Sequence, residues 1–467
     1  MSRPPPAGEV RRPVLKSLGP FKDRAELLLA VLLLGGLVLV TPRIAESDAV
    51  EYFSYLHSVW IDRDLDFTNE YTYFYLEDPE GRAAFKETFL DRETPTGLKN
   101  NFGPIGTALL WTPFYLVTHA GALLARALGA SVTTDGLSLP YRWAVTLASG
   151  IYGSIGLLLS YRLARRYADA EASLLAVVGL WWATPVAYYM YVAPGMSHAA
   201  SLFAVALFFT LWPWASSGSA GRWAVWGASA GLMALVREQD GLFAITALVA
   251  VVFSRWDLPG RLARLVAFGA SLWVVFLPQL LVYWVLYGRP GPSPHVENKM
   301  HWASPHALRV LFSPEHGLLF WTPLLLVFLV GAVILLRREL AAGLVLLAGF
   351  LAQVYISGAV DSWTTAGAFG ARRFVATTVI FAVWGAMALQ ALRPRLRRVG
   401  LYAAVGFFVL WNISLMVQFG LGLMDRQRLV WKEVVHNHLF EVPPRIFSVV
   451  GRYLTARGDL SGEREEP

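Results

Sequence analysis

The sequence predicts an all-α, polytopic membrane protein with about 11 transmembrane helices, within a range of about 10 to 13. Two observations predict this fold class. Hydrophobic residues make up 55% of the 467 positions and charged residues only 16%, against about 25% in soluble domains. Mean hydropathy is +0.47. Apolar runs also recur along the chain, although several are shorter than the roughly 20 residues that cross a bilayer.

The composition excludes several classes of protein. Cysteine is absent, so disulfides, thiol nucleophiles and cysteine-ligated metals are ruled out. Disordered chains are poor in apolar residues, so a disordered chain is excluded as well. The net charge of +7 and the pI near 9.5 show an excess of basic residues, which nucleic-acid-binding proteins also have. We interpret this excess as an orientation signal in a membrane, and we expect no nucleic-acid partner.

The chain is expected to divide into three parts. Residues 1–24 form a basic cytoplasmic tail, residues 25–423 form the transmembrane domain, and residues 424–467 form an exterior carboxyl-terminal tail. Within the domain, residues 43–140 form a large, acidic exterior loop, called loop one here. Loop one contains the apolar run Ile105–Leu124, which we expect to lie on the membrane surface or dip into it without crossing.

The first apolar run, Leu27–Val40, is short for a span, and Ser47-Asp48-Ala49 has the pattern of a signal-peptide cleavage site. Because many spans follow, we expect a signal-anchor helix instead. The other ten spans are expected at Tyr141–Tyr161, Ala172–Tyr191, His198–Trp214, Trp223–Val236, Gly241–Phe253, Leu265–Tyr287, Leu318–Leu336, Leu340–Ile356, Phe374–Leu392 and Leu401–Leu423.

Lysine and arginine follow the positive-inside rule when the amino terminus is cytoplasmic and Ile105–Leu124 does not cross. If that segment crossed, the arginines at 162–166 and the clusters after them would move outside. We therefore expect the carboxyl terminus outside a cell (inner or plasma) membrane. In this topology the unusual polar segments all face the exterior: loop one, Ala193–Ser197, Arg237–Asp240, Gly288–Gly317 and Gly358–Arg373.

The acidic start of loop one is the first candidate for catalysis. It opens with Glu46, where the first span ends, and continues through Asp48. If a helix forms here, Asp48, Glu51 and Tyr52 lie on one face. A carboxylate with aromatic neighbours at the membrane surface can act as a general base for a hydroxyl acceptor. The alternative interpretation is the solvated end of a helix.

Three arginines that we expect on the exterior side are candidate phosphate ligands. Arg237 opens a short charged run between two apolar segments, and Arg372 and Arg373 stand at the outer end of a span. Arginine suits bidentate contacts with phosphate. Two ordinary alternatives stay open. Glu238 or Asp240 pairs with Arg237, and the other two arginines snorkel to lipid headgroups.

Histidines are concentrated in one exterior loop. His295, Glu297 and His301 are candidate ligands for a divalent metal, although their spacing is not a standard zinc spacing. A polar, proline-rich loop is the alternative. His316 lies just before a span, and His198 starts a helix after another exterior turn. We place both histidines among the candidates for the lining of a substrate cavity.

Several stretches follow one another in a recognisable order: Glu46-Ser47-Asp48, Phe102–Leu124, the Y-x-L-A-R-R helix from Arg142 to Arg166, the G-L-x-x-L-x-R turn Gly231–Arg237, and the late exterior arginines. This order resembles the GT-C superfamily of integral-membrane glycosyltransferases. It is similar in particular to bacterial relatives of dolichyl-phosphate-mannose protein mannosyltransferases and of the lipid A aminoarabinose transferase. The resemblance is architectural and covers most of the chain.

The resemblance implies a polyprenyl-phosphate-linked sugar donor, a glycan, lipid or protein acceptor, and inverting transfer to a hydroxyl on the exterior face. Asp48 matches the loop-one acid and is implied to be the base. The paired acid of the family is spaced here as Glu46-x-Asp48, so Glu46 stays a second catalytic candidate. Arg237 and the two late arginines would hold the donor phosphate. Some relatives bind a divalent cation at this site, so a metal cofactor stays open.

Two other classes of function stay open. A transporter or flippase of a lipid-linked or anionic substrate would use the three arginines as a path, and a non-catalytic envelope assembly protein is the third class. The sequence shows no internal repeat of the kind that many transporters have, and its acidic, aromatic loop one favours the enzyme. The residues that we place around the substrate cavity are Glu51, Tyr52, His198, Glu238 and His316.

Overall fold

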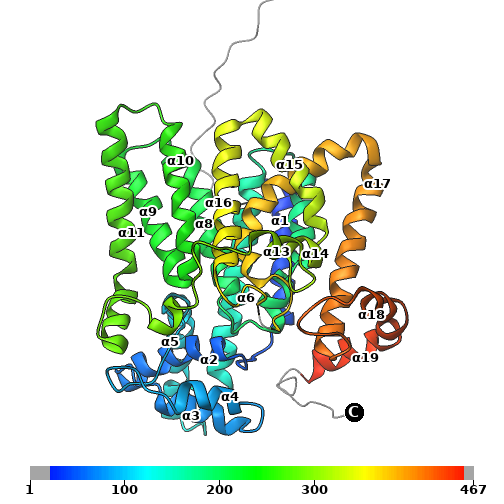
Figure 1. Ribbon diagram of the computed structural model, residues 1–467. Coiled ribbons are helices and arrows are strands. Elements are labelled where there is room, and N and C mark those ends of the chain that lie inside the picture. The colour runs from blue at the N-terminus through cyan, green and yellow to red at the C-terminus, as the bar shows by residue number, and fades with distance from the viewer. Residues whose placement is uncertain (1–20, 366, 457–467) are drawn as a thin grey trace, which may run out of the picture.

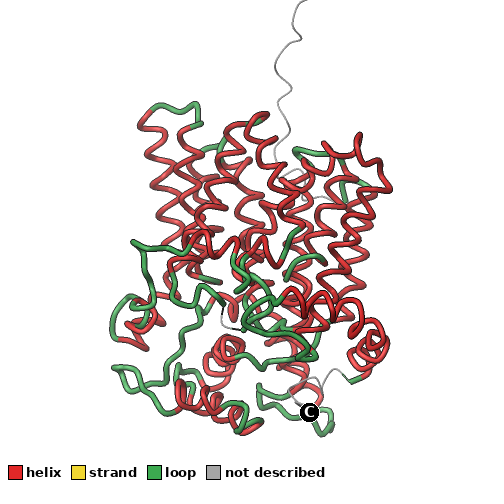
Figure 2. The backbone as a smooth tube through the Cα atoms, turned by 45° about the vertical axis from the view of Figure 1, so that its right-hand side comes forward, coloured by secondary structure: helices red, strands yellow, loops and turns green. Residues whose placement is uncertain are grey.

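The computed structural model describes residues 21–365 and 367–456. Most of the predicted basic tail, residues 1–20, therefore lies outside the described part, as do residues 457–467. The described residues contain helices, turns and two isolated β-bridges, with no strand among them. Figure 2 shows helices joined by loops and draws no strand among the described residues. The predicted all-α class is confirmed.

A bundle of helices forms the body of the molecule, and its longest members run between two opposite ends (Figure 1). Leu, Val, Ala and aromatic residues supply most of their length, as a helix surrounded by lipid and other helices requires. The members are α1 (Arg24–Gly36), α5 (Gly106–Ala127), α6 (Leu139–Ala164), α7 (Ala170–Trp182), α8 (His198–Ala215), α9 (Ala220–Val236), α10 (Thr246–Val252), α11 (Leu258–Tyr287), α15 (Leu324–Arg338), α16 (Leu340–Ala359) and α17 (Thr378–Gly420).

The two ends of the bundle carry different structural elements. The α10–α11 and α15–α16 connections and the bend of α17 lie at one end, and the short helices lie at the other, which we call the loop-one end (Figure 1). Longer loops also gather at the loop-one end (Figure 2). The short helices there include α2 (Ser47–His57), α3 (Thr68–Glu77), α4 (Ala83–Phe85), α18 (Trp431–His436) and α19 (Val442–Thr455).

The first helix is tied to the bundle by charged groups at its start. Asp23 caps α1 by accepting a hydrogen bond from the backbone N–H of Glu26, 2.9 Å away. The buried Glu26 carboxylate pairs with Arg162 at the end of α6. Asp23 also pairs with Arg165, at 3.1 Å. These contacts fix the direction in which the chain enters the bundle and approaches loop one.

Several predicted spans do not correspond to a single helix. The predicted span Phe374–Leu392 covers the end of the 3-10 helix η7 (Arg372–Thr377) and the start of α17, and the span Leu401–Leu423 follows Arg397, whose non-helical φ of 55° and ψ of 172° interrupt α17. The span predicted at Gly241–Phe253 consists of the 3-10 helix η6 (Glu238–Ile245) and α10. Six described helices are long and apolar enough to cross a membrane. The number of crossings stays a prediction.

Helix α5 runs antiparallel to α6 and lies beside its first half. Near the start of α5, the Trp111 indole N–H donates to Ser149 Oγ at 2.9 Å. Further along α5, His119 Nδ1 lies 2.9 Å from the hydroxyl of Tyr141. By length and composition α5 could cross a membrane. Our expectation that this segment does not cross stays a prediction.

Small residues let several helices approach one another closely. A Cβ added to Gly331 of α15 would lie 1.7 Å from the backbone oxygen of Trp384 in α17. A Cβ added to Gly227 of α9 would lie 2.0 Å from the backbone oxygen of Phe268 in α11. Transmembrane helices commonly use small residues in this way, because packing rather than hydrophobic transfer holds them together in lipid.

Candidate active site

Helix α2 carries the acidic candidates and is held by an aromatic core inside loop one. Phe53 packs edge-on against Phe74 of α3, with ring centroids 5.7 Å apart, and Tyr55 packs in the same way against Phe67 at 5.2 Å. The Tyr55 hydroxyl also donates to the backbone oxygen of Gly103 at 2.9 Å. The alternation of apolar residues with acids in 46–55 therefore positions the helix, while its first turn faces the bundle.

The first turn of α2 meets the late arginines. Asp48 Oδ2 lies 3.5 Å from Nη1 of Arg372, which begins the 3-10 helix η7 (Arg372–Thr377). The Asp48 side chain is 43% exposed and the Arg372 side chain 21%. Glu46 instead pairs with Arg43, at 3.6 Å. Of the two catalytic candidates, Asp48 is the one that keeps an accessible carboxylate in contact with one of the three arginines.

Arg237 lies in the same region, at the carboxyl end of α9. Its Nη1 donates to Ser197 Oγ at 3.0 Å and lies 3.2 Å from His198 Nδ1. Ser197 Oγ in turn donates to the Tyr52 hydroxyl at 3.1 Å. With the amide of Gln239 turned to satisfy its neighbours, the Gln239 oxygen accepts from Arg237 Nε at 2.9 Å. The guanidinium is thus linked to α2 through neutral groups.

The carboxylates that follow Arg237 have other surroundings. Asp240 is buried and accepts a hydrogen bond from Ser201 Oγ at 2.5 Å. Glu238 Oε1 is buried and has no hydrogen-bond partner among the described residues. Within the described part of the chain, no ion pair joins Arg237 to either carboxylate. The charged run is therefore more than the turn of a helical hairpin.

Arg373 is buried more deeply than its neighbour. Its Nη2 donates to Ser362 Oγ at 2.9 Å, and its backbone oxygen accepts from Gln353 Nε2 at 3.1 Å. Nη1 is buried without a hydrogen-bond partner among the described residues. Because Arg373 points into the protein, headgroup snorkelling does not describe its position.

The three arginines form one electrostatic cluster. Arg237, Arg372 and Arg373 each lie close enough to His198 to act on it electrostatically, and the first two also act on Arg373. Asp240 also acts electrostatically on Arg237, and Glu46 on Arg372, but Asp48 is the carboxylate in ion-pair contact with the cluster among the described residues. Buried positive charge is costly unless an anion compensates it.

Glu51 is a second carboxylate on the inner face of α2. It is buried, accepts a hydrogen bond from the backbone N–H of Phe102, and has its own backbone oxygen bound by Asn101 Nδ2 at 3.0 Å. Burial raises the pKa of Glu51 to about 8, and the nearby charge of Asp48 adds to the rise. Glu51 therefore carries a proton at neutral pH.

His316 lies in the loop before α14 (Leu318–Trp321), with a left-handed φ of 66°. Its ring stacks on Trp321, with centroids 4.7 Å apart and an interplanar angle of 12°. Burial lowers the pKa of His316 to about 4, and Arg372 lies close enough to contribute to this shift. The neutral imidazole lies at the edge of the arginine cluster.

The histidine-rich loop does not gather its metal-ligand candidates. His301 Nε2 pairs with Asp361, and Glu297 pairs with Arg289 at 2.7 Å. The ring of His295 packs against Phe102, with centroids 5.3 Å apart. Each candidate thus has a different partner, as expected for a folded polar loop.

Two serines in the site were missed from the sequence. Ser197 links Tyr52 to Arg237, and Ser362 orients Arg373. A serine next to an apolar segment carries little information, because most such hydroxyls bond to the backbone one turn away. Only the folded positions of the arginines identify these two serines.

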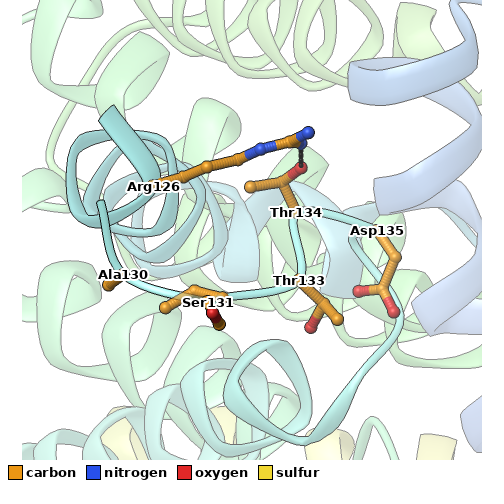
Figure 3. Close-up of a pocket in the computed structure, with 7 residues that line it drawn as sticks. Arg126, Ala130, Ser131, Thr133, Thr134 and Asp135 are labelled. Carbon is orange, nitrogen blue, oxygen red and sulfur yellow. Dashed lines mark hydrogen bonds between the residues drawn. The ribbon is translucent and has the colours of Figure 1, made fainter. Parts of the chain in front are cut away.

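An open hollow of about 600 Å³ lies elsewhere, in the connection between α5 and α6 (Figure 3). Arg126 crosses it and donates to Thr134 Oγ1 at 3.1 Å. The remaining lining is short polar or small side chains and includes none of the candidate active-site residues. We therefore assign the candidate active site to the arginine cluster and α2.

Known proteins resemble this chain in sequence and in fold. The family model described as dolichyl-phosphate-mannose-protein mannosyltransferase matches residues 137–284. ArnT from Cupriavidus metallidurans bound to undecaprenyl phosphate has a TM-score of 0.55 and 13% identity, over 93% of this chain and 78% of that chain. The apo-state structure of that ArnT has a TM-score of 0.48 and 14% identity, over 93% and 76%. No curated protein sequence matches the chain. The predicted GT-C-like fold and the resemblance to the superfamily are confirmed.

Proposed function

From the GT-C-like fold of this chain, we propose that it is a membrane glycosyltransferase that moves a sugar from a polyprenyl-phosphate-linked donor to a hydroxyl acceptor. The observation that carries this proposal is the 3.5 Å contact of Asp48 with Arg372, one of three clustered arginines. The Asp48 carboxylate is suited to accept a proton, and the arginines are suited to hold a phosphate. The ArnT structure of similar fold holds undecaprenyl phosphate, and we propose a donor of that chemical class here.

The reaction is an in-line displacement at the anomeric carbon. Asp48 takes the proton of the acceptor hydroxyl while the acceptor oxygen bonds to that carbon. The bond from the carbon to the phosphate oxygen breaks, and the lipid phosphate leaves with the electron pair. Arg237, Arg372 and Arg373 stabilise the charge on the leaving phosphate. Attack from the face opposite to the leaving group inverts the anomeric configuration.

The other candidates line this reaction centre in the proposal. Tyr52 holds Arg237 through Ser197, and His198 contacts Arg237 directly. The protonated Glu51 keeps the inner face of α2 neutral, so that Asp48 carries the negative charge. Glu238 and His316 lie at the borders of the cluster. Glu46, which pairs with Arg43, is proposed to position the start of α2.

The site is proposed to open on the exterior face. Loop one, the turn before α8 and the start of η7 meet at the loop-one end of the bundle. The distribution of lysine and arginine along the sequence supports the proposal that this end is outside. The donor then enters sideways from the lipid, and the acceptor enters from the aqueous side.

The test separates turnover from donor binding in full-length protein with a labelled polyprenyl-phosphate sugar. Asp48→Asn should lower turnover by about 10²-fold or more, as expected for loss of a general base, with donor binding retained. Arg372→Ala should weaken donor binding about 10- to 100-fold, as expected for a lost charged hydrogen bond. Glu87→Gln, an exposed acid of loop one, is the matched control.

Normal transfer by well-expressed Asp48→Asn would exclude Asp48 as the base. Donor binding that Arg372→Ala leaves unchanged would exclude the phosphate role of Arg372. Movement of the intact lipid-linked donor across the membrane, without sugar transfer, would instead support the transporter or flippase.

A further inference from the structure

Three side chains of loop one converge at the far end of α2. His57 Nδ1 lies 2.8 Å from Glu70 Oε1 and 3.0 Å from Asp62 Oδ2. One ligand atom from each residue lies within 4.8 Å of the others. His57 is buried, Glu70 is fully buried, and Asp62 is 29% exposed and leaves the group one open side.

The backbone around this group brings the ligand atoms together. Residues Ser58–Asp62 form the π-helical turn η3, which places Asp62 five residues after His57 on the same side of the turn. Arg63 then ends the turn in a left-handed conformation, with φ of 65°. Glu70 arrives from the first turn of α3. Two helices and a π-turn therefore contribute one ligand atom each.

The neighbours orient these side chains from outside the group. Asn69 Nδ2 donates to Asp62 Oδ2 at 2.7 Å. The backbone of Asp135 forms a hydrogen bond with the His57 ring. A Cβ added to Gly136 would lie 2.8 Å from His57 Cδ2, so this backbone packs against the Nε2 side of the ring. An Nε2–H donated to a backbone carbonyl leaves Nδ1 with a free electron pair, as in metal-binding histidines.

The carboxylate oxygens of this group can accept more hydrogen bonds than the protons of the three side chains can supply. Glu70 Oε2 is buried without a hydrogen-bond partner among the described residues. Two carboxylates face a single imidazole nitrogen, so with both carboxylates ionised the group carries one negative charge even when His57 is protonated. A buried carboxylate oxygen without a partner is unfavourable, and a cation between the three residues would compensate both charge and lone pairs.

We propose that His57, Asp62 and Glu70 bind a divalent transition-metal ion of the Zn²⁺ class. One imidazole nitrogen and two carboxylate oxygens are a common ligand set for such ions. Ligand atoms at about 2.1 Å from a tetrahedral metal lie about 3.4 Å apart, so the side chains, now 2.8 Å and 3.0 Å apart, would separate by a few tenths of an ångström to admit the ion. Water completes the coordination on the open side beside Asp62.

This metal site is separate from the arginine cluster and does not depend on the proposed function. His57 lies nine residues after Asp48 on one helix, which is about 13 Å along the axis. The ion joins the end of α2 to α3 and to the 135–136 backbone. Its role is to hold α2 in place, so it supports the acid at the other end of that helix without taking part in chemistry.

The test uses full-length protein without a polyhistidine tag, treated with a chelator, returned to metal-free buffer and titrated with Zn²⁺. We expect one Zn²⁺ per chain and a rise in thermal stability on binding. Asp62→Asn should weaken Zn²⁺ binding at least 10-fold, and His301→Ala, in the histidine-rich loop, should leave it unchanged. Co²⁺ should give visible absorption bands that Asp62→Asn removes.

Two outcomes would overturn the site. In the first, wild-type protein binds no Zn²⁺, and the three residues form only a buried ion pair of His57 with the two carboxylates. In the second, Zn²⁺ binds but Asp62→Asn does not change the binding. If Asp62→Asn does not fold, Asn69→Ala keeps the question open to test, because loss of an orienting partner weakens metal binding about 10- to 100-fold. Unchanged binding in Asn69→Ala together with unchanged Co²⁺ bands would also contradict the site.

Discussion

The charged residues of the site differ in how many hydrogen-bond and ion-pair partners the protein gives them. Among the described residues, Arg373 has one nitrogen on Ser362 and one without a hydrogen-bond partner, while Glu51 accepts a hydrogen bond from a backbone N–H and forms no ion pair. The sequence could predict Asp48 and the arginines because charges beside apolar runs are rare and need a reason. It could not predict Ser362 or the protonation of Glu51, since both follow from burial in the folded state.

Glu51 allows a prediction on stability and pH. Its pKa is raised from 4.5 to about 8 in the folded protein, so the folded state holds a proton that the unfolded chain releases above pH 4.5. This contribution to stability is complete below about pH 4.5 and is lost as the pH rises toward about 8. Wild-type thermal stability should therefore fall more between pH 5 and pH 8 than that of Glu51→Gln.

The measurement is the unfolding temperature of both proteins in detergent, followed by tryptophan fluorescence at the two pH values. Glu87→Gln, an exposed carboxylate in the same loop, should show the same fall as wild type. Parallel curves for Glu51→Gln and wild type would contradict the raised pKa.

At the scale of elements, apolar runs predicted where helices lie but not what kind of helix forms. The predicted segments Tyr141–Tyr161 and His198–Trp214 correspond to α6 and α8. The 3-10 helix η6 and the π-turn η3 have no comparable signal, because both depend on contacts that bend the backbone after it folds. For this reason the His57–Asp62 pair was missed, since α-helical spacing does not join residues five apart.

The close contact of α15 with α17 leads to a second prediction. A Cβ at Gly331 would lie 1.7 Å from a backbone oxygen of Trp384, so Gly331→Ala must move one helix. Overpacking of this kind costs about 1–3 kcal/mol, and for a chain of this length we expect a fall of about 1–3 °C in the unfolding temperature.

Gly406→Ala, also in α17, is the matched control, because a Cβ there meets nothing within 4 Å. It should be neutral or slightly stabilising, since alanine favours helices by about 1 kcal/mol over glycine. Equal unfolding temperatures for the two variants would mean that the helices separate easily at this point.

At the scale of the whole molecule, the main feature is that the polar segments gather at the loop-one end of the bundle. The polar segments that the charge pattern predicts on one side of the membrane meet in the fold: loop one contacts Arg372 at the start of η7, and the turn before α8 contacts Arg237 after α9. Composition and charge were enough to predict this convergence. They could not predict that residues 431–455 would form α18 and α19 at the same end, because a short polar tail has no apolar run to read.

The absence of cysteine makes the orientation directly testable. Glu87→Cys lies in loop one, and Arg398→Cys lies in the bend of α17, where the arginine side chain is 72% exposed. In intact cells, a membrane-impermeant maleimide should label Glu87→Cys and should label Arg398→Cys only after lysis. The opposite pattern would reverse the topology, and the wild-type chain, which has no thiol, is the blank.

The π-turns carry a consequence for how such chains diverge. The described residues contain four of them, each on or next to a segment of the loop-one end: Ser58–Asp62, Lys86–Leu90, Tyr188–Val192 and Asn437–Glu441. A π-turn equals an α-helical turn with one residue inserted, and one residue turns a helix by about 100°. Deleting a single position from Ser58–Asp62 would leave composition and hydropathy almost unchanged and yet rotate Asp62 away from His57. Among relatives of this chain, segment length at these turns should therefore record a change of site more faithfully than residue identity does.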